Sequence, residues 1–409
     1  MICEYTLLVY IFCACKTEAN VLEIRLCRYR KVYPPMVFRE LGNTGLKVSQ
    51  LGFGAMRLPM VGDGNDKRVD REKAIPMIHR AFKAGVNYID SAIGYCNKDS
   101  QRAVGDALIG WRDKIMVSTK NHNYGESEQE WWQHLEDSLR RLKVDYIDIY
   151  NHHGMGAKRY EEAVKPRVSK WMQKAKEQGL IRHICCSTHD GSEGVIKLVD
   201  SGYVDSITCQ YNFLDRRNEE GIAYAHKKGV GIVVMGPVGG GRLGVRSEVL
   251  EKLIVGVKRV PDLALRFVLS NPNVCVALSG MSTMQQVEEN LATAADEISL
   301  SETDQAAIEE HFQRIQKIAE LYCTGCGYCL PCPRNVAIPK IFERFNLGRA
   351  YGLWDTAKDM YSKIGSNNWD TGKKANACVE CGKCEEKCPQ NIPIIKQLKE
   401  AHQALTNSH

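Results

Sequence analysis

The sequence lacks several features that assign chains to common classes of protein. It has no basic run and no interleaved aromatic pattern, although its formal net charge is +6, so we expect no nucleic-acid partner. Its apolar stretch over residues 5–15 is shorter than the roughly 20 residues needed to cross a bilayer, so we expect no membrane partner. No G-x-G-x-x-G motif follows the first predicted strand, which disfavours a doubly wound dinucleotide-binding sheet.

Cysteine, in contrast, is abundant. The chain has 17 cysteines in 409 residues, and a disulfide-stapled secreted domain would be much shorter. Eight of the cysteines fall in two clusters near the carboxyl terminus. Clustered thiols in a long, enzyme-like chain indicate metal ligands and a reducing compartment, so we predict a cytoplasmic protein.

The first 35 residues differ from the chain that follows. The apolar stretch is preceded by Glu4 and by no Lys or Arg, so it lacks the charged start of a signal peptide. Met36 is followed at once by a regular pattern, "VFRELGNTGLKVSQLGFG". We predict that residues 1–35 are a poorly ordered extension or the product of a wrongly assigned start codon.

From residue 36 to about 300, short apolar runs alternate with stretches of helical spacing. The eight predicted strands span 48–56, 87–92, 115–120, 146–153, 181–188, 206–212, 231–237 and 274–280. Eight such units in roughly 250 residues are typical of a (β/α)8 (TIM) barrel, and a doubly wound sheet is the alternative. We predict an α/β barrel over 36–300, preceded by a hairpin with Asn-Thr-Gly at its turn.

Polar side chains stand at the ends of several of these strands. Asp90 ends the second strand, Lys120 the third and His153 the fourth, while Gln210 lies near the end of the sixth. In a barrel these positions meet at one face, where active sites of this fold are built. A lone lysine there could be a surface residue whose ammonium reaches solvent, but three ionisable groups at consecutive strand ends indicate a shared site.

The motifs "DSAIGY", "VSTK" and "DYIDIYNHHG" resemble those of the aldo-keto reductase family, whose fold is a (β/α)8 barrel. The resemblance covers residues 38 to about 295 and implies a catalytic tetrad of Asp90, Tyr95, Lys120 and His153. His152 is expected to point the other way, because successive side chains alternate along a strand.

The chemistry of the tetrad follows from the demands of carbonyl reduction. Tyr95 would donate the proton, and the Lys120 ammonium would lower the pKa of its phenol. Asp90 would hold Lys120 charged, and His153 would orient the carbonyl oxygen. The hydride must come from a nicotinamide, since no side chain can donate one.

The same resemblance implies contacts to NAD(P)H. Ser187 and Thr188 stand where the family has a Ser-Asn pair on the nicotinamide amide, and Met235 replaces its stacking Tyr. Gly280 and Gln286 stand where NADPH-preferring relatives place Lys and Arg against the 2′-phosphate, so the choice between NADH and NADPH stays open. The predicted cofactor-binding residues are Gly54, Met56, Ser187, Thr188, Gln210, Met235, Gly236, Pro237, Gly280, Gln286, Glu289 and Asn290.

The second cysteine motif is Cys378-x2-Cys381-x2-Cys384-x3-Cys388 followed by proline. This is the bacterial ferredoxin spacing for a [4Fe–4S] cluster, in which the fourth cysteine ligates the other cluster when two are present. Zinc is the alternative, but zinc sites more often pair two C-x2-C units across a long gap.

The first motif, Cys323-x2-Cys326-x2-Cys329-x2-Cys332 followed by proline, is one residue shorter before its last cysteine. We predict two clusters with crossed ligation, in which the first three cysteines of each motif combine with the last cysteine of the other. The intervening residues have helical spacing and resemble α-helical ferredoxin-like domains. We predict a linking helix over 301–322 and a ferredoxin-type iron–sulfur domain over 323–409.

Together these features predict an iron–sulfur aldo-keto reductase that interconverts a carbonyl and an alcohol with NAD(P)H. A ferredoxin or a flavoprotein is expected as its one-electron donor or acceptor. Two alternatives are an electron-transfer protein whose barrel binds a flavin and a redox-sensing protein whose barrel docks a partner. The complete tetrad favours the enzyme.

Overall fold

Eight short apolar segments form a closed barrel of parallel strands, in the order expected from the sequence. The computed structural model describes residues 35–125, 127–254, 257, 259–295, 300–319, 327–367, 370–388 and 392–407, without the side chains of 65 and 314–319. The barrel strands are β3 (Leu51–Gly54), β6 (Tyr88–Asp90), β7 (Met116–Asn121), β8 (Ile147–His152), β9 (Ile181–Ser187), β10 (Ser206–Gln210), β11 (Gly231–Met235) and β12 (Val276–Gly280). All eight predicted strands, and therefore the (β/α)8 architecture, are confirmed.

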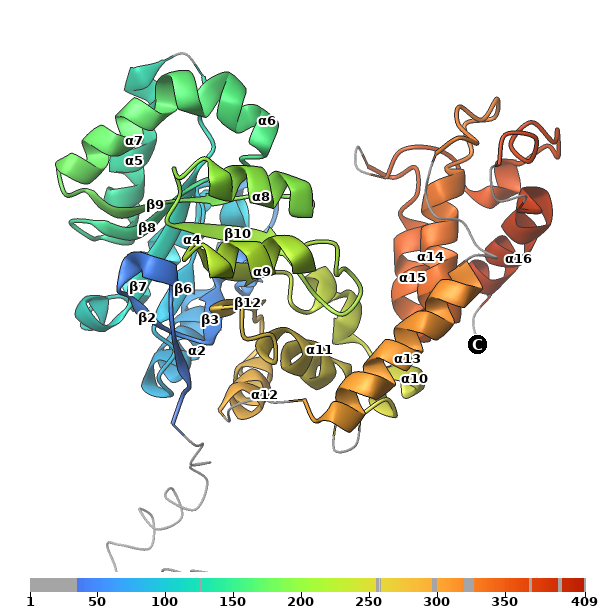
Figure 1. Cartoon of the computed structure of the whole chain (residues 1–409), viewed down its shortest axis with the longest axis horizontal. Helices are drawn as coiled ribbons and strands as arrows, with labels where there is room; N and C mark the ends of the chain where they lie inside the picture. Colours follow the sequence, from blue (N-terminus) through green and yellow to red (C-terminus); the bar gives the residue numbers. More distant parts are fainter. Residues whose placement is uncertain are drawn as a thin grey trace, which may run out of the picture. The chain divides into compact units, whose positions relative to one another are not determined.

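Helices between the strands surround the barrel (Figure 1). They are α2 (Arg71–Lys83), α4 (Ser100–Ala107), α5 (Glu128–Leu142), α7 (Ser169–Glu177), α8 (Ser192–Asp200), α9 (Glu219–Lys227), α11 (Val260–Leu269) and α12 (Met284–Ala294). The π-helix η5 (Tyr160–Val168) precedes α7, and shorter turns of helix are α3 (Tyr95–Lys98), α6 (Ala157–Arg159), η6 (Gly239–Gly244) and α10 (Glu248–Glu251).

Helix α5 illustrates why these segments are helical. The hydroxyl of Ser127 accepts a hydrogen bond from the backbone N–H of Glu130, which satisfies one free donor at the amino terminus of the helix. Trp131, Leu135 and Leu142 recur at helical spacing and are fully buried. The helix is therefore held to the barrel by one apolar face.

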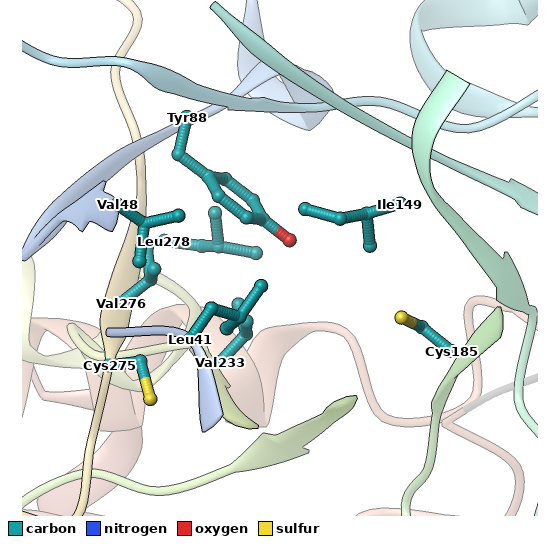
Figure 2. Close-up of a cluster of buried hydrophobic side chains, with 9 residues drawn as sticks. All are labelled: Leu41, Val48, Tyr88, Ile149, Cys185, Val233, Cys275, Val276 and Leu278. Carbon is teal, nitrogen blue, oxygen red and sulfur yellow. The ribbon is translucent and has the colours of Figure 1, made fainter. Parts of the chain in front are cut away.

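A hairpin closes the amino-terminal end of the barrel, as predicted. Strand β1 (Phe38–Glu40) pairs antiparallel with β2 (Lys47–Ser49). Leu41 and Val48 from this hairpin join the buried cluster of Figure 2, which also contains Tyr88, Ile149, Cys185, Val233, Cys275, Val276 and Leu278. Gly42 has a φ of +52°, and a Cβ there would collide with the carbonyl oxygen of Gly229. The hairpin can approach the barrel this closely only with glycine at that position.

The carboxyl-terminal part is helical, as the spacing between the cysteine motifs predicts. Helix α13 (Glu302–Ala319) precedes the first motif, and α14 (Ile338–Tyr351) and α15 (Trp354–Ser362) follow it. After the second motif, α16 (Ile394–Thr406) packs against α14 and α15 (Figure 1). The predicted extension 1–35 lies outside the described residues except for its last one, as do 320–322 of the linking segment. The predicted domain limits stay predictions.

The three helices after the first motif share an apolar core. Ile341, Phe345 and Leu398 are buried in it. A Cβ at position 348 would collide with the indole of Trp354. Because Gly348 has none, α14 and α15 can meet closely at this point. Within the described part of the chain, no helix is both long and apolar enough to cross a membrane.

Candidate functional site

The predicted tetrad converges at the carboxyl-terminal ends of β6, β7 and β8. Lys120 is only 2% exposed, and its ammonium donates to Asp90 Oδ1 and to the carbonyl of Ser91, the latter over 2.9 Å. Ser118 Oγ donates to the other oxygen of Asp90 over 2.7 Å. This carboxylate is therefore held by two donors, one of which is charged.

Tyr95 and His153 complete the group. Lys120 Nζ lies 4.8 Å from the centroid of the Tyr95 ring. The Tyr95 and His153 rings meet edge to face, with centroids 6.1 Å apart and an interplanar angle of 87°. The Lys120 ammonium and the His153 imidazole therefore both lie close to the Tyr95 ring.

Burial changes the expected acidity of Tyr95. Burial raises the pKa of the phenol, and Asp90 adds to the increase, whereas the nearby Lys120 charge lowers it. The net pKa lies above the usual value. The predicted lowering of this pKa by Lys120 agrees with that contribution, but the sequence argument did not include the larger, opposite effect of burial.

Lys120 and His153 have opposite protonation states. Burial lowers the pKa of Lys120, but Asp90 and Tyr95 raise it by more, so the amine stays charged. Burial lowers the pKa of His153 to about 4, with the Lys120 charge adding to the decrease. The imidazole is therefore neutral near pH 7.

His152 faces away from the tetrad. Its Nε2 lies 2.9 Å from Tyr203 Oη, and its ring stacks on Tyr124. Burial lowers its pKa to about 3. Tyr124 Oη in turn donates to the carbonyl of His153 over 3.0 Å, so this outer layer supports the backbone of the tetrad histidine.

The segment that carries Tyr95 has an unusual backbone. Cys96, Asn97 and Lys98 all have left-handed conformations, with φ of 50°, 54° and 65°. This is rare for residues other than glycine and needs support from the surroundings. No sequence pattern predicts this left-handed run of residues.

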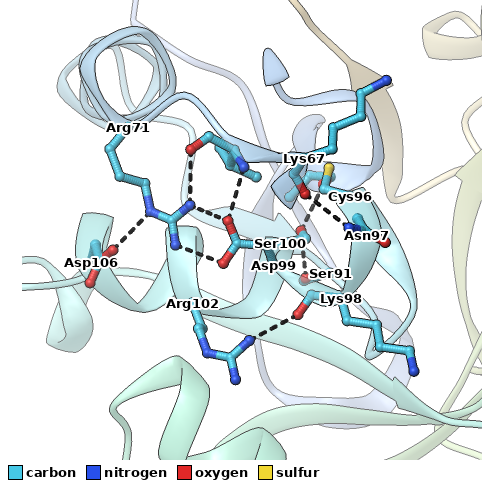
Figure 3. A network of polar contacts seen from close by, with 12 residues as sticks. Lys67, Arg71, Ser91, Cys96, Asn97, Lys98, Asp99, Ser100, Arg102 and Asp106 are labelled. Atoms are coloured by element: carbon cyan, nitrogen blue, oxygen red, sulfur yellow. Dashed lines mark hydrogen bonds and ion pairs between the residues drawn. The ribbon is translucent and has the colours of Figure 1, made fainter. Parts of the chain in front are cut away.

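A polar network supplies that support (Figure 3). Arg71 Nη1 and Nη2 both donate to the Asp99 carboxylate, the second over 3.0 Å. Asp99 Oδ2 also accepts the backbone N–H of Val69 over 2.9 Å. Ser100 Oγ donates to the carbonyl of Ala55 over 2.7 Å, which ties the segment to the end of β3.

A cavity of about 990 Å³ opens beside the tetrad. Asp90 and Tyr95 line it, and so does His189, which the sequence argument did not select. Ten predicted cofactor-binding residues also line it: Gly54, Met56, Gln210, Met235, Gly236, Pro237, Gly280, Gln286, Glu289 and Asn290. Gly236 has a φ of +65°, and its backbone lies against the Gln210 amide.

Two predicted cofactor residues do not line this cavity. Ser187 Oγ instead accepts the backbone N–H of Gly154 over 3.0 Å, and Thr188 Oγ1 accepts that of Asp190 over 3.1 Å. Both hydroxyls therefore support the turn after β8 and the loop after β9.

Four arginines on the cavity wall were missed by the sequence argument: Arg57, Arg242, Arg246 and Arg259. Only Arg242 carried a signal, because it follows three consecutive glycines, all with positive φ. Such a glycine-rich turn lets the backbone approach a ligand closely. No comparable sequence signal marks the other three arginines.

The described cysteines of the two motifs lie close to each other. Cys332 lines one small cavity together with Cys378, Cys381 and Cys384, and Cys329 reaches the same wall. Cys388 does not line it. Cys323 and Cys326 lie outside the described residues, and among the residues described no three Cys, His, Asp or Glu side chains converge closely enough to hold a metal ion.

Comparison with known proteins agrees with both parts of the chain. Residues 50–313 match the Aldo/keto reductase family, and residues 322–393 match a 4Fe-4S dicluster domain. L-galactose dehydrogenase of Arabidopsis thaliana is 30% identical over 299 residues, 66% of this chain and 92% of that protein. NADH-specific methylglyoxal reductase of Escherichia coli is 26% identical, covering 68% and 98%.

A solved structure extends the likeness to three dimensions. Aldo-keto reductase AKR11C1 from Bacillus halodurans in its holo form superposes with a TM-score of 0.57 at 30% identity, over 67% of this chain and 96% of that one. With the family match spanning more than half of the sequence, the chain belongs to the aldo/keto reductase family of NAD(P)-dependent oxidoreductases and carries a 4Fe-4S dicluster domain after its barrel.

Proposed function

We propose that the barrel interconverts a small carbonyl compound and its alcohol, with Tyr95 as the proton donor in the direction of reduction. The observation that carries the proposal is that Tyr95, which lines the large cavity, has Lys120 and His153 against its ring. A catalytic constellation beside a cavity at the carboxyl-terminal end of barrel strands is where this fold places chemistry.

Each side chain has a role that matches its protonation state. Tyr95, whose pKa is raised by burial, holds its proton near pH 7 and can donate it to the carbonyl oxygen. The Lys120 ammonium stabilises the phenolate that remains, and Asp90 keeps that ammonium in place. Neutral His153 hydrogen-bonds the substrate oxygen and fixes its direction.

The cavity suits a nicotinamide dinucleotide. Its volume of about 990 Å³ is at the upper end of the range for ligand sites, and it runs from Tyr95 to the amino terminus of α12. The bound nicotinamide supplies the hydride. Gln210, Met235 and Gly236 would hold it near Tyr95, while Gln286 and Asn290 lie at the adenosine end.

The test is Tyr95→Phe in the full chain. We expect carbonyl reduction to fall at least about 1,000-fold while nicotinamide binding stays near normal, because only the proton donor is removed. Tyr224→Phe is a matched control, since Tyr224 Oη donates to Asp200 over 2.6 Å outside the tetrad. Undiminished turnover in Tyr95→Phe would show that the barrel has another function.

We further propose two [4Fe–4S] clusters with crossed ligation. Cys332 would join Cys378, Cys381 and Cys384, which is supported by the small cavity that all four line together with Cys329. Thiolates are the donors that such clusters need, so the donor set fits. Cys388, which lies apart from that cavity, would join the first three cysteines of the first motif.

The clusters imply a partner that exchanges single electrons. A nicotinamide transfers two electrons together, whereas a [4Fe–4S] cluster takes one, so a ferredoxin or a flavoprotein is the expected partner. Reduced thiolates are also best preserved in the cytoplasm, where we place the protein.

A further inference from the structure

One arginine on the cavity wall differs from its neighbours in its electrostatic surroundings. Three of the four face carboxylates: Arg242 with Glu343, Arg246 with Glu251, and Arg259 with Asp262 and Glu289. Arg57 forms no ion pair among the described residues, and its Nη2 donates only to the carbonyl of Gly240, over 2.9 Å. It therefore brings a positive charge to the cavity that no carboxylate offsets.

The stem of Arg57 lies over Gly280. A Cβ built on Gly280 would be 3.4 Å from Arg57 Cδ and 3.5 Å from Cβ and Cγ, so the arginine occupies the space that a side chain at 280 would enter. Ser282 Oγ donates to the carbonyl of Arg57 over 2.7 Å. The first bond fixes the Arg57 backbone, and the bond to Gly240 fixes its guanidinium, which reduces the entropy lost when the side chain binds a ligand.

We infer that Arg57 binds the 2′-phosphate of NADP(H) and makes the enzyme accept the phosphorylated dinucleotide. This inference rests on the proposed function, because it needs a dinucleotide in this cavity. Gly280 and Gln286, the two positions where the family resemblance places phosphate-binding cations, carry no charge, and Arg259 on the same wall is paired with Glu289. Arg57, at the end of the short 3-10 helix η2 (Ala55–Arg57) after β3, would supply the missing cation from the strand next to β12.

The chemistry of the two groups is complementary. A phosphate monoester carries a charge of about −1.5 to −2 at pH 7, and a guanidinium binds it through two parallel hydrogen bonds. Gln285 and Gln286, in the first turn of α12, line the same wall. Thr283 Oγ1 accepts the backbone N–H of Gln286, and the dipole of the helix adds partial positive charge at this terminus.

The test is the affinity of the full-length protein for NADPH and NADH, measured separately by fluorescence titration. We expect Arg57→Ala to weaken NADPH about 10-fold and NADH less than twofold, because one charge-assisted contact is lost only from the phosphorylated form. The probe 2′,5′-ADP should lose affinity in the same proportion as NADPH. Arg246→Ala is the matched control, since it removes the same charge from the same wall, and should leave the ratio of the two affinities unchanged.

A second variant makes the test independent of local damage. Once Arg57 is truncated, a lysine fits at Gly280, so Arg57→Ala with Gly280→Lys should restore most of the NADPH affinity. Equal losses for NADPH and NADH in Arg57→Ala would overturn the inference, because Arg57 would then contact a part common to both. No loss for either would overturn it as well. If the wild-type protein bound neither dinucleotide, the proposed function itself would fail.

Discussion

The ammonium of Lys120 bridges two acidic groups: it donates to the Asp90 carboxylate and lies 4.8 Å from the centroid of the Tyr95 ring. All three groups are largely withdrawn from water. Asp90 and Tyr95 raise the pKa of Lys120, and the Lys120 charge in turn lowers that of Tyr95. This triangle explains how a charged lysine remains inside the barrel.

Replacing Lys120 by Met should destabilise the fold as well as stop turnover. Asp90 would stay buried without its cation, which costs about 3–5 kcal/mol when a buried pair is broken from one side. Thermal and urea unfolding of the single variant should show the loss. The double variant Lys120→Met with Asp90→Asn should recover part of it, since the uncompensated charge is gone, and failure to recover would contradict the buried-pair argument.

Arg71 should control activity without touching the substrate. It holds Asp99 and so supports the left-handed segment that follows Tyr95. We expect Arg71→Met to lower kcat about 10-fold or more with little change in nucleotide affinity, because Tyr95 moves relative to the cavity.

Arg102→Met is the control for that experiment. Arg102 is exposed, and its guanidinium donates to the carbonyl of Lys98 over 3.3 Å rather than to the Asp99 carboxylate. Its kinetic constants should match those of the wild type. Equal effects in the two variants, or a change in nucleotide affinity alone, would contradict a positioning role for Arg71.

Iron analysis should give the number of clusters, and the spectra of cysteine variants should distinguish crossed from local ligation. Anaerobically prepared protein is expected to contain about eight iron atoms per chain, as two [4Fe–4S] clusters. Under crossed ligation, Cys332→Ser and Cys381→Ser alter the same cluster and give the same change in the electron paramagnetic resonance spectrum. Cys209→Ser, at a buried cysteine of β10, should change neither cluster. A Cys332→Ser variant with a wild-type spectrum would contradict the ligand assignment.

Acid should weaken the fold through the two adjacent histidines. The folded-state pKa is about 3 for His152 and about 4 for His153, against about 6.5 in an unfolded chain. Below pH 6.5 the unfolded state therefore binds more protons, and stability falls as the pH decreases toward 4. Each histidine adds a slope of up to about 1.4 kcal/mol per pH unit.

This slope can be measured by thermal unfolding between pH 7 and pH 5. Ordinary carboxylates titrate below this range, so they contribute little to the slope. His152→Gln should show a shallower dependence than the wild type. His226→Gln, at an exposed histidine of α9, should not. A wild-type melting temperature that is constant over this range would contradict the assigned protonation states.

The barrel and the two cysteine motifs could be read from the sequence, and so could the residues that we propose as the catalytic tetrad. Strand positions followed from apolar runs such as "IMVSTK", because burial in a closed parallel barrel demands them. Asp90, Lys120 and His153 could be assigned to one site because strand ends of a barrel share a face. The ferredoxin spacing indicated the iron–sulfur domain, because cluster geometry constrains the intervals between thiolates.

The protonation states at the site and the residues of the cavity wall depend on packing between segments that are distant in the sequence. The raised pKa of Tyr95 results from burial, which depends on the packing of the whole barrel mouth. Ser187 and Thr188 were expected on the cofactor, but their hydroxyls bond the backbone of neighbouring loops. Arg57 meets Gly280 across more than two hundred residues of sequence, since β3 and β12 are adjacent only after the barrel closes. Contacts of this kind are set by strand order and loop path, which local sequence patterns do not encode.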